Sequence, residues 1–130
     1  MRPPTSARVQ RAGSTFAADA GACVRRVDPI DGSTGIFRDA LVVLHVSHPL
    51  DEASLDARAF SVWDPEGPVP GSLSLTGSGD VLVWTGARPL RADALHVVLA
   101  RGLRDAAGRE LPEHCSRFVP CALALEDLRG

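Results

Sequence analysis

The stretch VPGSLSLTGSGDVLVWT, residues 69–85, contains two short segments in which apolar side chains alternate with polar or small ones. Successive side chains of a β-strand point to opposite faces, so Leu82 and Trp84 share one face of the second segment. The residues between the segments, Gly77 to Asp80, are typical of a tight turn, because glycine adopts positive φ angles without steric cost. This stretch therefore predicts a β-hairpin with one buried face.

Segments of the same kind recur on both sides of the hairpin, at intervals of about 8–15 residues, as in sandwiches and barrels. A single helical turn is expected at residues 51–55, with Asp51 as its cap. Seven strands without a long amphipathic helix predict an all-β sandwich of about seven strands, which the resemblance described below identifies as an immunoglobulin-like β-sandwich. The predicted strands cover residues 23–28, 41–47, 60–63, 69–76, 81–85, 94–101 and 116–122.

The alternation within each strand also predicts which side chains fill the space between the two sheets. Trp84 is expected in the core, whereas Trp63 is out of phase with Phe60 and Val62 and is expected to be at least partly exposed. The predicted core positions besides Trp84 are Val42, Leu44, Val46, Phe60, Val62, Leu82, Val98, Ala100 and Leu103.

The chain of 130 residues is long enough for one domain with a substantial core. We expect a disordered leader at residues 1–22, the sandwich at 23–125 and a short tail at 126–130. All 14 basic residues are arginines spread along the chain, and the net charge of −2 gives no reason to expect nucleic acid as a partner. The longest uncharged apolar stretch, residues 40–46, is far shorter than the roughly 18 residues of a membrane span, so none is expected.

The N-terminal segment contains one feature of an export signal. Ala20-Gly21-Ala22-Cys23 looks like the end of a lipoprotein cleavage box, in which Cys23 would carry a lipid anchor. The leucine and the apolar segment that normally belong to such a box are missing, so we do not expect the anchor.

Four stretches together resemble the bacterial Ig-like domains of the S-layer type, the SbsA-like Ig-like domains. Residues 27–36 (VDPIDGSTGI) are similar to the family's opening "V-x-P-x-D-G-A-T-G-V". Residues 42–55 are similar to the next strand with its "x-P-hydrophobic-D-x-x-S" continuation. The dipeptide at 89–90 and residues 102–108 (GLRDAAG) match "P-L" and "G-L-x-D-x-A-G". The likeness covers most of the predicted sandwich.

The resemblance implies an Ig-like module of a secreted or cell-surface protein, acting as a spacer, stalk or adhesion unit, with no catalytic residues and no cofactor. We therefore expect a non-catalytic structural or binding module in an extracytoplasmic location (secreted, periplasmic or cell surface). Its expected partner is a neighbouring domain or protein, which includes a second copy of the chain. Two alternatives stay open: a periplasmic copper-binding protein of similar fold, and an accessory domain of an extracellular enzyme.

The residues indicate turn chemistry rather than a reactive site. Asp31 with Gly32, and Asp105 with Gly108, suit structural turns, because aspartate accepts hydrogen bonds from nearby backbone amides and glycine permits positive φ. His45 and the histidine three residues later point to opposite faces of a strand, so no metal site is expected. A Gly-x-Ser-x-Gly nucleophile elbow is also missing, and we do not expect an enzyme.

The chain has three cysteines. In an extended strand Cys115 and Cys121 would be about 20 Å apart, beyond the roughly 7 Å limit for a disulfide. Since first and last strands are neighbours in this fold, Cys23 is expected to pair with Cys115 or Cys121 in an oxidising compartment. Three reduced thiols in a cytosolic protein remain the alternative.

An apolar patch is predicted on the outside of the sandwich. If strand six keeps the family's phase, with His96 and Val98 in the core, then Val97 and Leu99 point away from it. Trp63 of the neighbouring strand points the same way, which gives a patch of about a few hundred Å², near the size that indicates an interface. The alternative is a strand slipped by one residue, which would bury Val97 and Leu99.

Overall fold

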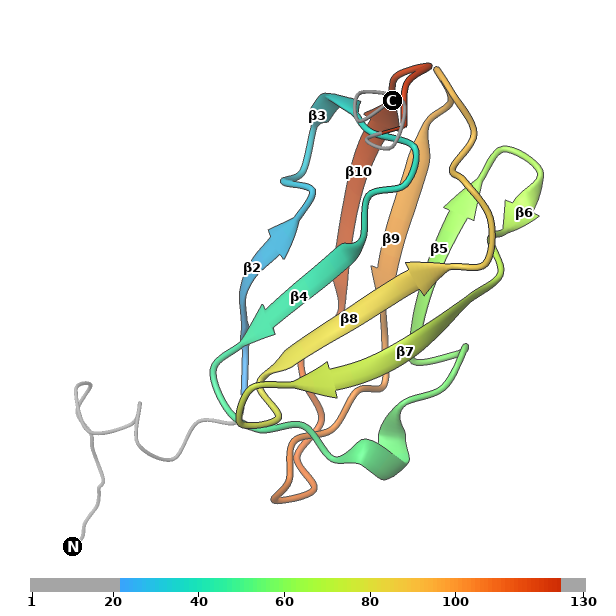
Figure 1. Ribbon diagram of the computed structural model, residues 1–130. Coiled ribbons are helices and arrows are strands. Elements are labelled where there is room, and N and C mark those ends of the chain that lie inside the picture. The colour runs from blue at the N-terminus through green and yellow to red at the C-terminus, as the bar shows by residue number, and fades with distance from the viewer. Residues whose placement is uncertain (1–21, 125–130) are drawn as a thin grey trace, which may run out of the picture.

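The computed structural model describes residues 22–124, which form two β-sheets packed face to face (Figure 1). This confirms the predicted all-β sandwich, with nine described strands in place of about seven. A short 3-10 helix at Glu52–Ser54 precedes β5, and Asp51 caps it by accepting the backbone N–H of Ala53. The strands are β2 (Val24–Asp28), β3 (Ser33–Ile36), β4 (Val42–Val46), β5 (Phe60–Asp64), β6 (Gly67–Pro68), β7 (Gly71–Thr76), β8 (Val81–Gly86), β9 (His96–Ala100) and β10 (His114–Pro120).

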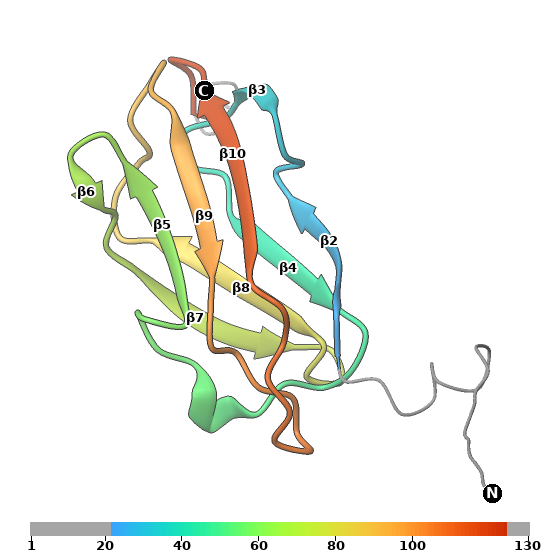
Figure 2. The ribbon, with the colours of Figure 1, turned by 180° about the vertical axis from the view of Figure 1, so that it is seen from behind.

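The two sheets contain strands from both halves of the chain. One sheet has the order β3-β10-β9-β5-β6 and the other the order β2-β4-β8-β7 (Figures 1 and 2). The strand pairs are antiparallel except β3 with β10, which run parallel. Along the described chain the path changes sheets five times: after β2, β3, β4, β6 and β8.

The two strands that the sequence did not predict, β3 and β6, lie next to turns. β3 follows the Asp31-Gly32 turn and has no alternation of apolar residues, but Ser33 stands opposite Phe118 of β10. β6 has only two residues and folds back on the end of β5, with Pro68 opposite Trp63. Both strands are therefore specified by their partner strands rather than by their own side chains.

The predicted leader and tail lie almost entirely outside the described residues. The exception is Ala22, which is buried and donates its N–H to Asp105 Oδ2 at 3.3 Å. No helix within residues 22–124 has the length and apolar character that crossing a membrane would require.

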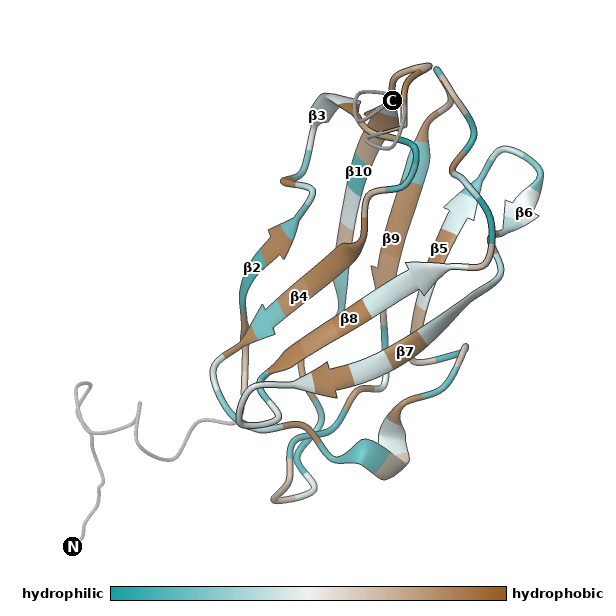
Figure 3. Cartoon of the chain, viewed as in Figure 1, coloured by the Kyte–Doolittle hydropathy of each residue, from teal (hydrophilic) through white to brown (hydrophobic). Residues whose placement is uncertain are grey.

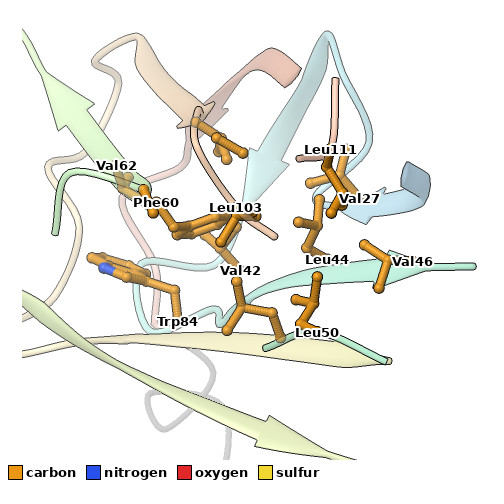
Figure 4. Packing of buried hydrophobic residues seen from close by; sticks show 14 of the residues in the cluster. Val27, Val42, Leu44, Val46, Leu50, Phe60, Val62, Trp84, Leu103 and Leu111 are labelled. Atoms are coloured by element: carbon orange, nitrogen blue, oxygen red, sulfur yellow. The ribbon is translucent and has the colours of Figure 1, made fainter. Parts of the chain in front are cut away.

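The predicted phase of the core strands is confirmed. Val42, Leu44 and Leu82 are fully buried, and Trp84 is 3% exposed whereas Trp63 is 39% exposed. Hydrophobic residues follow β4 and β9 on the two sides of the core (Figure 3), and Figure 4 shows the Trp84 side chain lying under Phe60. The predicted positions in β9 and the loop after it, including Leu103, are buried as well.

The first and last described residues lie at opposite ends of the sandwich. Figures 1 and 2 both place the start of β2 at one end of the long axis and the end of β10 at the other. Near the first end, Cys23 O accepts the N–H of Ser47 at 2.9 Å. Near the second, Leu123 O accepts the N–H of Arg38 at 2.9 Å. The described chain therefore passes through the fold from end to end.

Candidate interaction surface

The structure places the three residues of the predicted patch on one face. β5 and β9 are neighbours, with Trp63 opposite Val97 and Ser61 opposite Leu99. In β9 the alternate residues His96, Val98 and Ala100 are buried, so strand six is not slipped and its other residues point outward.

The indole ring of Trp63 does not extend freely into solvent. Its Nε1–H donates to Ser61 Oγ at 2.8 Å, two residues earlier on the same strand. Because Ser61 stands opposite Leu99, the ring lies back along β5 toward the level of Leu99. Together Trp63, Val97 and Leu99 form the surface that we call the outer patch. On its other side Arg117 of β10 stands opposite Val97, which places a cation at the rim.

Further exposed leucines lie at the end of the sandwich where the described chain stops. Leu95 is 50% exposed just before β9, and Leu123 is 47% exposed just after β10. These two loops are held together, because Asp93 donates its backbone N–H to Pro120 O at 2.8 Å. The sequence does not mark these leucines as part of a surface, since loop positions have no periodicity and only the fold brings them together.

The two predicted turn aspartates accept backbone hydrogen bonds. Asp31 Oδ1 accepts the N–H of Arg117 at 2.9 Å, and the Gly32 N–H donates to Arg117 O at 2.7 Å. The turn therefore holds the entry to β3 against β10. Gly32 has a φ of +85°, a conformation that side chains strongly disfavour.

Asp105 is buried within a set of hydrogen-bond donors. Its Oδ1 accepts the N–H groups of Ala107 at 3.0 Å and Arg109 at 2.9 Å, and Gly108 between them has a φ of +86°. Its Oδ2 faces the N–H of Ala22 and the guanidinium Nε of Arg109 at 3.2 Å. The Arg109 backbone N–H, helped by the Ala22 amide and the Arg109 charge, lowers the pKa of Asp105 although burial acts in the opposite direction.

The histidines are dispersed rather than gathered. His96 is fully buried and stacks on Phe118 with 5.2 Å between ring centroids, whereas His45 lies 3.7 Å from Asp28. Within residues 22–124 no three His, Cys, Asp or Glu side chains are grouped so that they could hold a metal ion.

The expected disulfide is not supported, because Cys23, Cys115 and Cys121 are all free thiols. The expected pairing required the first strand to lie beside the last. That strand is in fact divided: β2, which follows Cys23, pairs with β4, and only β3 pairs with β10. Cys115 points away from the core, since the next residue, Ser116, is buried. Cys121 lies beyond the far end of β10, at the opposite end of the sandwich from Cys23 (Figure 2).

Comparison with known proteins places the fold but not a family. No family model matches the sequence, and no curated protein matches it. A solved structure of the S-layer protein SbsC matches with a TM-score of 0.63 and 20% identity over 82% of this chain, which corresponds to 14% of that chain. CopC from Methylosinus trichosporium OB3b matches with a TM-score of 0.64 and 18% identity, covering 80% of this chain and 98% of that one.

An L,D-transpeptidase from Mycobacterium smegmatis matches with a TM-score of 0.57 and 14% identity, covering 78% of this chain and 41% of that one. The resemblance to S-layer Ig-like domains that the sequence motifs indicate thus holds at the level of the fold: the chain is a β-sandwich similar to domains of these proteins.

Proposed function

We propose that this chain is a non-catalytic Ig-like module of a bacterial secreted or cell-envelope protein, and that it positions a neighbouring domain of the same polypeptide. Its outer patch and the leucines beside it are the surface on which that domain docks. The proposal rests mainly on one observation, the pairing of Trp63 with Val97 on the outward face of the five-stranded sheet. An exposed aromatic side chain beside aliphatic ones, with a cation at the rim, has the composition of a protein interface.

The path of the chain supports a neighbour in the same polypeptide. The described residues end at Ala124, directly after the exposed Leu123. The end of β5 and the start of β9, which contain Trp63 and Val97, lie toward the same end of the sandwich (Figure 1). A domain that follows would therefore be tethered beside this apolar surface. The similar domains in SbsC and in the L,D-transpeptidase make up 14% and 41% of their own chains.

The extracytoplasmic location is part of the proposal. The S-layer protein and the L,D-transpeptidase that resemble this chain support it, together with the motifs of the S-layer type. The absence of a metal-ligand group within residues 22–124 gives no support to a copper-binding role, although CopC shares the fold.

The test is the double change Val97→Thr with Leu99→Thr in the full-length polypeptide. Both side chains point outward, so the melting temperature of this domain should change little. Small-angle scattering should show a wider range of arrangements of this domain and its neighbour. A matched control is Val43→Thr with Val83→Thr, an outward-facing pair on the other sheet that should leave the coupling unchanged. Equal coupling in all three proteins would refute the proposed docking surface.

A further inference from the structure

The strand β7 is an edge strand whose backbone is open on one side. It pairs with β8, and no other strand within residues 22–124 pairs with it. Its sequence, Gly-Ser-Leu-Ser-Leu-Thr, contains no charged residue and no proline. Natural edge strands usually contain charged residues or proline, which hinder pairing of the open edge with another chain.

The hydrogen bonds of the β7–β8 hairpin show which residues face this open edge. Pro70 O accepts the N–H of Ala87 at 2.9 Å, immediately before the first pair of the ladder. Bonded and non-bonded pairs alternate in an antiparallel ladder. Every second residue after Pro70 therefore bonds to β8, and the residues between them, Gly71, Leu73 and Leu75, direct their N–H and C=O groups to the open edge.

An apolar groove runs beside the same edge. Its volume is about 570 Å³, and Phe60, Pro68 and Leu73 are among the residues that line it. Trp84 also lines the groove, and it is 3% exposed. A Cβ on Gly71 would lie 2.5 Å from the indole nitrogen, so the ring occupies the place of a side chain and the Gly71 backbone packs directly on it.

The order of residues in β7 is complementary to itself. If two copies pair antiparallel with Leu73 opposite Leu73, the Leu75 of each copy stands opposite Gly71 of the other. All three edge-facing residues of each copy are then in hydrogen-bonded pairs. Each Leu75 then stands opposite a glycine of the other copy, where no opposing side chain blocks it. A strand without charges meets no like-charge repulsion in this arrangement.

We propose that β7 pairs with β7 of a second copy of this chain, joining the two four-stranded sheets into one continuous sheet across a two-fold axis. The partner is a second copy because glycine at one end of the strand accommodates leucine from the other end. The surface is separate from the outer patch, which belongs to the five-stranded sheet, so this inference and the proposed docking role can fail independently.

The test uses charge on the solvent-facing side chains of β7. In the proposed register Ser72 of one copy stands opposite Ser74 of the other, and both side chains are exposed in the single chain. One variant carries Ser72→Lys with Ser74→Lys, and a second carries Ser72→Glu with Ser74→Glu. In sedimentation equilibrium each variant should show a dimer dissociation constant raised roughly tenfold, because like charges face each other across the seam. An equimolar mixture of the two variants should form the dimer again, because opposite charges then face each other. Thr85→Lys, on the same face but one strand away from the seam, is the control.

Hydrogen exchange of the wild-type chain gives a second readout. On raising the protein concentration, the amides of Gly71, Leu73 and Leu75 should gain protection, while the alternate amides already bonded to β8 should not change. A chain that stays monomeric at millimolar concentration would overturn the proposal. So would a dimer that is insensitive to both charge variants, since it would use another surface.

Discussion

Replacing Gly71 by alanine tests the close packing of β7 on Trp84. The added Cβ would lie 2.5 Å from Trp84 Cε2 and Nε1 and 2.7 Å from Thr85 O. Ordinary contacts are about 3.5–4 Å, so the methyl group would overlap the ring by roughly 1 Å and force either the indole or the strand to move. Overpacking of this kind costs about 1–3 kcal/mol, and the reduced freedom of the unfolded chain offsets only about 0.4–1 kcal/mol of it.

The assay is urea unfolding at low protein concentration, followed by tryptophan fluorescence. Gly71→Ala should lower the free energy of unfolding by about 1–2 kcal/mol. Ser72→Ala, an exposed neighbour on the same strand, should change it by less than about 0.5 kcal/mol. In a Trp84→Phe background the smaller ring should remove the part of the cost that comes from the indole, while the contact with Thr85 O remains, and a double-mutant cycle would show this coupling. If Gly71→Ala is neutral or stabilising with Trp84 intact, the argument for tight packing is wrong.

Three further outcomes are expected. Trp84→Ala should destabilise the protein by about 3–5 kcal/mol in the same assay, and Trp63→Ala by less than about 1 kcal/mol, so equal losses would contradict the strand phase. Asp105→Asn should lower the melting temperature at pH 7 because Oδ2 no longer accepts hydrogen bonds. The folded pKa of Asp105 lies below its ordinary value, so the stability that it contributes is present above about pH 3.9 and is lost as the pH falls through the folded pKa. The variant should therefore show a weaker decline of melting temperature below about pH 4, and an unchanged pH profile would count against the role of the carboxylate. Finally, thiol labelling of the denatured, non-reduced protein should find three free thiols. A single free thiol would instead show that the disulfide expected from the sequence does form.

The core strands could be predicted from the sequence because each carries its own signal. In β4 and β9 buried and half-buried residues alternate without a break, so the pattern alone indicates which face is inside. β3 carries no such signal: Ser33, Thr34 and Gly35 look like a turn, and they become a strand only because β10 offers its edge to them. Sequence patterns report on a residue's own neighbours and not on its partner strand.

Local sequence patterns do not identify partner strands, and for this reason the predicted disulfide was wrong and the candidate surface was predicted only in part. The choice of β4 as the partner of β2 depends on where the chain changes sheets, and no local pattern marks that. The outward direction of Val97 followed from the resemblance, since the slipped register has nearly the same alternation. The exposed Leu95 and Leu123 could not be joined to the patch before the loops were placed.

The parallel pair of β3 and β10 has a consequence for a chain under tension. The described residues begin and end at opposite ends of the sandwich, and both strands run toward the end where Ala124 lies (Figure 1). A pull transmitted through the polypeptide therefore draws β3 and β10 past each other lengthwise. The bonds from Gly32 N to Arg117 O and from Cys121 N to Ile36 O, both 2.7 Å, bracket this pair. Bonds loaded lengthwise must give way together, whereas peeled bonds open one at a time. β2, which pairs with β4, lies between the start of the described chain and β3 and is loaded by the same pull. The rate of forced extension, which follows the unfolding barrier, then depends on these two short ladders as well as on the hydrophobic core.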